Sequence, residues 1–156
     1  MALSRRVLLA SSLLPGTAVS ASLALEVTGA INPPTPRRLH LADLDALGTD
    51  ELVTQTPWTH GTQRFGGLLL RRLLDAVGAH GGTLRAVALN DYAVTMPIAA
   101  TILDGGFLAT RQNGAPLPVR ERGPFWIVFP WSQRPELDTA QHRQRAIWQL
   151  RRIEVS

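Results

Sequence analysis

The sequence predicts an α+β domain, built on mixed and antiparallel sheets of short strands with two or three short helices. Short segments that alternate apolar and polar residues, or are rich in Val and Thr, are separated by Gly, Pro and Asn-Asp turns. Only a few segments place apolar residues at helical spacing. The 156 residues, 45% of them hydrophobic, fit one compact domain.

The first elements are expected directly after residue 24. Leu25–Ile31 alternates apolar and polar side chains and predicts a strand, whereas the proline-rich Asn32–Arg38 predicts a connector. Leu41–Leu47 has helical spacing with Gly48 as its stop. Glu51–Thr56 predicts a strand that ends at Pro57.

The middle of the chain contains the strongest helix signal. Thr59–Arg64 is expected to be a polar loop, and Leu69–Val77 a helix stopped by Gly78. Thr83–Leu89 predicts a strand that ends in an Asn90-Asp91 turn. Pro97 suits the start of a short helix that runs to Leu103.

The last third predicts more strands. Phe107–Arg111 is expected to be a strand followed by a turn at Asn113-Gly114, and Phe125–Phe129, apolar on both faces, a central buried strand. Pro135–Arg145 predicts a short helix or an ordered loop. In the closing segment Trp148 and Leu150 share one parity and Ile153 and Val155 the other, which predicts a bulge near Arg151-Arg152.

Residues 1–24 are typical of a cleaved secretory signal, and residues 25–156 of a single domain. Arg5 and Arg6 precede an apolar run that Pro15 and Gly16 interrupt, and small residues follow. We therefore expect export to the periplasm, by the general or a twin-arginine-like route. An uncleaved N-terminal anchor is the alternative.

Composition excludes several classes of function. A net charge of +4 is too small for a nucleic-acid-binding face. The absence of cysteine removes thiolate metal sites and cysteine nucleophiles. The four histidines are scattered without metal-ligand spacing, so no protein-ligated metal is expected.

Three groups of residues are candidates for a ligand site. Asn90, Asp91 and Tyr92 follow a strand, where a carboxylate could accept hydrogen bonds from an amino-pyrimidinone edge; a simple Asx turn is the alternative. Loop arginines could converge on a phosphate or carboxylate, or could be solvated surface residues; these are Arg111, Arg120, Arg122 and Arg134.

The third group is aromatic. Phe125, Trp126 and Phe129 are expected to be mainly core. Trp131 follows Pro130 and leaves the strand, so it is the one of this cluster expected to reach a ligand. Trp58 follows Pro57 at another strand end and is a second candidate.

Several of these segments together resemble the sulfite-oxidase-type molybdopterin-binding domain. The similar segments are Trp58 with FGGLLLRRLL (65–74), APLPVRERG (115–123) and RAIWQLRRIEV (145–155). The resemblance covers about residues 25–155 and implies the sulfite-oxidase fold and a pterin or molybdopterin ligand. It also implies ligand-binding roles for Thr56 and Gly123 beside the candidates above. The family's enzymes bind molybdenum through a cysteine, and at the corresponding place this chain has Thr54 or Thr56.

Three functions follow from these expectations. The first is an exported protein that binds a pterin and signals to a membrane partner, as some small exported proteins of this fold do. The second is a molybdenum-cofactor-dependent oxidoreductase that lacks the cysteine ligand. The third is a structural domain without a small ligand, in which Asp91, Tyr92 and Arg111 do not converge. The sequence leaves open whether the protein is an enzyme.

Overall fold

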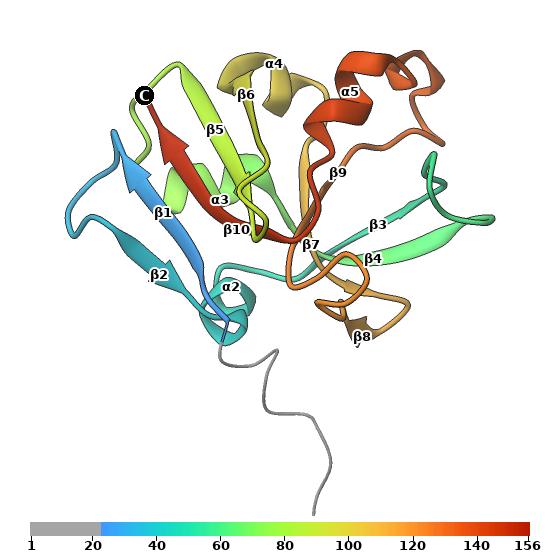
Figure 1. Ribbon diagram of the computed structural model, residues 1–156, viewed down its shortest axis with the longest axis horizontal. Helices are drawn as coiled ribbons and strands as arrows, with labels where there is room; N and C mark the ends of the chain where they lie inside the picture. The colour runs from blue at the N-terminus through green and yellow to red at the C-terminus, as the bar shows by residue number, and fades with distance from the viewer. Residues whose placement is uncertain (1–22) are drawn as a thin grey trace, which may run out of the picture.

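The computed structural model describes residues 23–156, so the predicted signal segment lies almost wholly outside the described residues. Two five-stranded sheets form the framework. Sheet A has the strand order β2-β1-β10-β5-β6, and sheet B has the order β3-β4-β7-β8 with β9 also paired to β7. In Figure 1, sheet A lies to the left and most of sheet B to the right. The expected α+β class is confirmed.

Sheet A is mixed, because β1 runs parallel to β10 while its other pairs are antiparallel. Its strands are β1 (Leu25–Gly29), β2 (Arg37–Leu39), β5 (Thr83–Ala88), β6 (Ala93–Pro97) and β10 (Leu150–Val155). The register between β10 and β5 shifts between Leu150 and Arg152. This irregularity is the bulge that the change of parity predicts.

Sheet B is antiparallel throughout the described pairs. Its strands are β3 (Asp50–Thr54), β4 (Gln63–Leu69), β7 (Phe107–Gln112), β8 (Ala115–Pro116) and β9 (Trp126–Val128). A side chain at Gly67 of β4 would collide with the Leu108 carbonyl of β7. The close approach of these two strands therefore requires glycine at this position.

Residues 23–156 contain four short α-helices and one 3₁₀ turn, against two or three helices predicted. They are α2 (Leu41–Ala46), α3 (Leu70–Ala76), α4 (Ile98–Leu103), η1 (Pro135–Leu137) and α5 (Ala140–Arg145). The Thr139 side chain caps α5 by accepting a hydrogen bond from the His142 backbone N–H. Within the described range, no helix is long and apolar enough to span a membrane.

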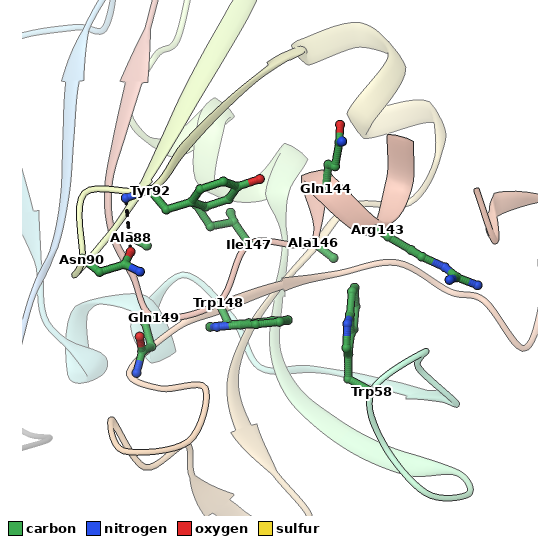
Figure 2. Close-up of a pocket in the computed structure, with 10 residues that line it drawn as sticks. All are labelled: Trp58, Ala88, Asn90, Tyr92, Arg143, Gln144, Ala146, Ile147, Trp148 and Gln149. Carbon is green, nitrogen blue, oxygen red and sulfur yellow. Dashed lines mark hydrogen bonds between the residues drawn. The ribbon is translucent and has the colours of Figure 1, made fainter. Parts of the chain in front are cut away.

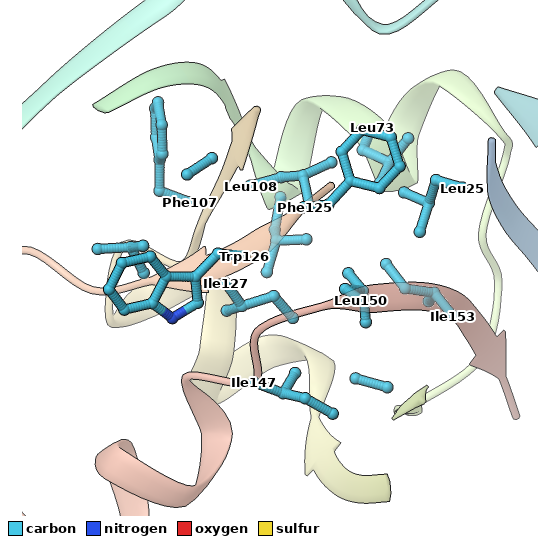
Figure 3. Close-up of a cluster of buried hydrophobic side chains, with 14 of the residues drawn as sticks. Leu25, Leu73, Phe107, Leu108, Phe125, Trp126, Ile127, Ile147, Leu150 and Ile153 are labelled. Atoms are coloured by element: carbon cyan, nitrogen blue, oxygen red, sulfur yellow. The ribbon is translucent and has the colours of Figure 1, made fainter. Parts of the chain in front are cut away.

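The core lies where the two sheets and α3 meet (Figure 3). Leu73 of α3, Leu108 of β7 and Ile153 of β10 are fully buried there. Trp126 of β9 is also fully buried, and its indole N–H donates to the Ala146 carbonyl at 3.1 Å. This bond ties β9 to the end of α5, which lies beside the pocket described below.

Four sequence-based assignments are wrong. The expected connector 32–38 ends in β2, and the expected loop 59–64 contains the start of β4. The β6 strand was not predicted at all. The strand expected over 125–129 is buried but not central, since β9 pairs within the described structure with β7 alone. In the first three cases pairing with the preceding strand of the chain outweighs the local signal, as β2 pairs with β1, the start of β4 with β3, and β6 with β5.

Candidate ligand pocket

A pocket of about 390 Å³ opens between the β5–β6 turn, the end of α5 and the loop that carries Trp58 (Figure 2). This volume lies within the usual range of small-molecule sites. The lining is mostly apolar, with amide side chains and one guanidinium. The residues that line it are Trp58, Ala88, Asn90, Tyr92, Arg143, Gln144, Ala146, Ile147, Trp148 and Gln149.

Two tryptophans form a corner of the pocket. The rings of Trp58 and Trp148 are 5.3 Å apart between centroids and nearly perpendicular, at 82°. Figure 2 shows both rings edge-on, with Trp148 lying flat and Trp58 standing as a wall. Trp126 contacts both from the core, at 6.0 and 6.3 Å. The corner therefore rests on a buried aromatic and offers ring faces to a flat ligand.

Arg122 lies behind this corner. Its guanidinium is 5.2 Å from the centroid of Trp126 and 5.6 Å from that of Trp148. One of its nitrogens donates to the Trp58 carbonyl at 3.2 Å. Its buried Nε has no hydrogen-bond partner among the described residues. Arg122 thus links three tryptophans and places a positive charge next to the pocket.

Gln149 joins the two loops that the sequence singled out. Its backbone N–H donates to the Arg122 carbonyl at 2.9 Å, and its carbonyl accepts from the Leu89 N–H at 2.8 Å. Its side-chain nitrogen donates to the Val119 carbonyl at 2.7 Å. The Asn90 corner and the Pro-Leu-Pro loop therefore meet at one site.

Asn90 and Tyr92 line the pocket, whereas Asp91 does not. The Asn90 side-chain oxygen accepts from the Tyr92 backbone N–H at 3.1 Å, and Tyr92 is 51% exposed at the rim. Asp91 adopts a positive φ of 67° and is exposed, paired with Arg151. Its expected role as acceptor for a ligand in this pocket is therefore not supported by its position.

Arg111 also lies outside the pocket, so Asp91, Tyr92 and Arg111 do not converge, which is the geometry expected for a structural domain without a small ligand. Two of its nitrogens bind the Asp45 carboxylate, each at 2.7 Å. These hydrogen bonds lower the pKa of Asp45 below its ordinary value and raise that of Arg111, against a smaller opposing effect of burial. Arg111 is thus committed to an ion pair, as Arg134 is with Glu136 at 3.0 Å. Arg120 is exposed.

The threonines at the expected cysteine position lie on the far side of the Trp58 loop. Thr56 lines a separate pocket of about 240 Å³ with Trp131 and Ser132. The Thr54 hydroxyl donates to the Gln55 carbonyl and accepts from the Ser132 N–H, both at 2.9 Å. The Thr56 hydroxyl lies 2.8 Å from that of Thr59. Both hydroxyls are engaged by the protein.

Trp131 and Gly123 have structural positions. Trp131 is largely buried, its indole N–H donates to the Leu137 carbonyl at 3.1 Å, and it lines the pocket of Thr56 but not the pocket of Trp58 and Trp148. Gly123 is buried in the loop, where a Cβ would collide with the Leu117 carbonyl. Glycine here is required by packing.

The sequence reasoning missed the pocket residues of the closing segment, Arg143 to Gln149. The change of parity predicted the bulge near Arg151-Arg152 and did not single these residues out. Gln149, directly before β10, has a positive φ of 49°, and Trp148 next to it is 36% exposed. The exposed part of Trp148 faces the pocket, which is how the closing segment contributes to the site.

Among the described residues, no group of three or more His, Asp or Glu side chains could hold a metal ion. A search of curated proteins finds no match to this chain. The sulfane dehydrogenase SoxCD from Paracoccus pantotrophus is similar in structure, with a TM-score of 0.64 and 16% identity. The alignment covers 87% of this chain and 38% of that one, and at this identity the likeness shows the fold alone.

The family comparison is more direct. The model of the oxidoreductase molybdopterin-binding domain matches residues 17–133, well over half of the chain. The matched range includes Trp58, Asn90, Tyr92 and Arg122 but ends before the closing segment. The chain therefore belongs to the oxidoreductase molybdopterin-binding domain family.

Proposed function

We propose that this protein is an exported pterin-binding domain that reports its ligand to a membrane signalling partner and does not itself catalyse a reaction. The observation that carries the proposal is the open corner of Trp58 and Trp148, with amide side chains beside it. A pterin is a flat bicyclic ring with a polar rim. Stacking on an aromatic face and hydrogen bonds at the rim are what such a ring needs.

The residues present fit the pterin part of molybdopterin better than its metal. Thr54 and Thr56 offer neutral hydroxyls in place of a thiolate, and a hydroxyl is a poor ligand for a soft metal site. Both hydroxyls already have hydrogen-bonding contacts within the protein. We therefore infer a binding role in which no residue of this chain holds molybdenum.

The alternative function, a molybdenum-cofactor-dependent oxidoreductase, is supported by membership of the family. In that case the complete cofactor would supply the redox chemistry, and the chain would bind its pterin end in the same pocket. Metal analysis of protein isolated from its native export route separates the two functions. About one molybdenum per chain would support the oxidoreductase, whereas metal-free protein that binds a pterin would support the sensor.

Export and the membrane partner depend on residues 1–24, whose sequence is typical of a signal. Fractionation of cells that express the full chain tests the location. Crosslinking in whole cells, with and without pterin synthesis, tests the partner. A protein that stays in the cytoplasm would contradict both parts of the proposal.

Ligand binding is tested by calorimetry and thermal stabilisation with oxidised, dihydro and tetrahydro pterins. A ligand at 100 times its Kd stabilises the folded protein by about 2.7 kcal/mol. Trp148→Ala should weaken binding by about tenfold or more, since stacking on one aromatic contributes about 1–3 kcal/mol. Leu103→Ala, 78% exposed on α4, is the control. The absence of binding to any pterin would refute the proposal.

A further inference from the structure

We infer that Asn90 and Gln149 form a fixed donor–acceptor pair that selects a cyclic amide edge, a ring N–H beside a carbonyl, over the corresponding amino-substituted ring. This inference rests on the proposed binding of a pterin in the pocket. Asn90 would donate a hydrogen bond to the ligand's rim, and Gln149 would accept one from it.

The orientation of the Asn90 amide is set by its own backbone. Its oxygen accepts from the Tyr92 N–H at 3.1 Å, and because a backbone N–H can only donate, the accepting atom must be the amide oxygen. The amide nitrogen is left as a donor. Figure 2 shows this nitrogen on the side of Asn90 that faces Trp148.

The orientation of the Gln149 amide is set in the opposite sense. Its nitrogen donates to the Val119 carbonyl at 2.7 Å, and because a backbone carbonyl can only accept, the amide oxygen is left as an acceptor. In Figure 2 this oxygen lies on the side toward Asn90 and the nitrogen on the far side. The two backbone hydrogen bonds of Gln149 hold its left-handed conformation in place.

Asn90 and Gln149 therefore present one amide donor and one amide acceptor beside Trp148, whereas Gln144, the third amide of the lining, points away from them in Figure 2. Among residues 23–156, no hydrogen bond joins the two amides to each other, and no carboxylate lines the pocket. A ring N–H beside a carbonyl satisfies both groups at once. An amino group beside an unprotonated ring nitrogen reverses the pattern, so the ring must either turn over or leave both amides unpaired, which should weaken binding by about tenfold or more.

The test compares two compounds that differ at one position, 6-hydroxymethylpterin with a 4-oxo group and 2,4-diamino-6-hydroxymethylpteridine with a 4-amino group. Wild-type protein should prefer the 4-oxo compound by about tenfold or more in calorimetry. Asn90→Asp keeps an oxygen for the Tyr92 N–H but replaces the donor by an acceptor. This variant should lose or reverse the preference.

Gln141→Glu is the matched control, because it adds the same charge at an exposed position of α5 that does not line the pocket. It should leave the preference unchanged. Gln149→Asn, which tolerates the left-handed backbone, withdraws the acceptor and should also reduce the preference. Melting temperatures of all variants show whether each one folds.

The outcomes distinguish failure of pterin binding from failure of the amide pair to select the ligand. If wild-type protein binds neither compound nor any other pterin, the proposed function fails and this inference with it. If it binds pterins but the preference is absent, or survives in folded Asn90→Asp protein, the amide pair does not read the rim and the pterin proposal stands alone.

Discussion

Arg122 offers the sharpest test of how the pocket is held together. It makes one charged hydrogen bond to the Trp58 carbonyl and two cation–π contacts, to Trp126 and Trp148. Such a hydrogen bond contributes about 1.5–3 kcal/mol and each cation–π contact about 0.5–1 kcal/mol. Against these stands a buried Nε without a partner among the described residues, which costs about 1–3 kcal/mol.

The balance predicts that Arg122→Met lowers the free energy of unfolding by about 1–2 kcal/mol in urea. Arg122→Lys should recover only part of this, since an ammonium lacks the planar fork. Tryptophan emission should shift as well, because Arg122 contacts Trp126 and Trp148 directly. Arg120→Met, an exposed neighbour in the same loop, should change stability by less than about 0.5 kcal/mol. An Arg122→Met protein as stable as Arg120→Met, with unchanged emission, would refute this account.

Two further predictions concern stability away from the amides. The pKa of Asp45 is lowered by Arg111, so the pair stabilises the fold above the ordinary pKa near 3.8 and loses this effect as the pH falls through the lowered value. Asp45→Asn should therefore cost about 0.5–1 kcal/mol at pH 7, and acid unfolding curves should show this difference shrinking as the pH falls below the ordinary pKa of Asp45. Gly123→Ala should destabilise the protein by about 2 kcal/mol or more, because the new Cβ meets the Leu117 carbonyl, whereas Gly82→Ala, with open space around it, should be close to neutral; thermal melts of both compare them directly.

The part of the fold that could be predicted from the sequence is the part set by local chemistry. Leu69–Val77 predicted α3 to within a residue at each end because its leucines recur on one face and Gly78 follows. The bulge in the last strand was visible as a change of parity. Where pairing with a distant strand determines the structure, the local signal is misleading. The Gly66-Gly67 pair lowers the strand propensity of β4, yet the close approach of β7 requires glycine there.

The candidate site shows the same division. Trp58, Asn90 and Tyr92 were singled out because each follows a strand end, and all three line the pocket. Arg111 has an equally suggestive position at the end of β7, but Asp45, 66 residues earlier in the chain, binds it. No pattern in the sequence around Arg111 predicts such a partner. A strand-end position therefore indicates that a side chain is available to a site but not which neighbour engages it.

The pocket is built from two parts of the chain, and only one of them lies within the range that the family model matches. Trp58, Asn90 and Tyr92 lie within the matched range 17–133, whereas Trp148 and Gln149 follow it. The two parts are joined by Gln149, which binds the Arg122 and Leu89 backbones. A change in the closing segment can therefore alter what the pocket accepts without altering the sheets that carry it. Any ligand of this pocket would contact Trp148 and Gln149, and both residues lie beyond the range that the family model matches.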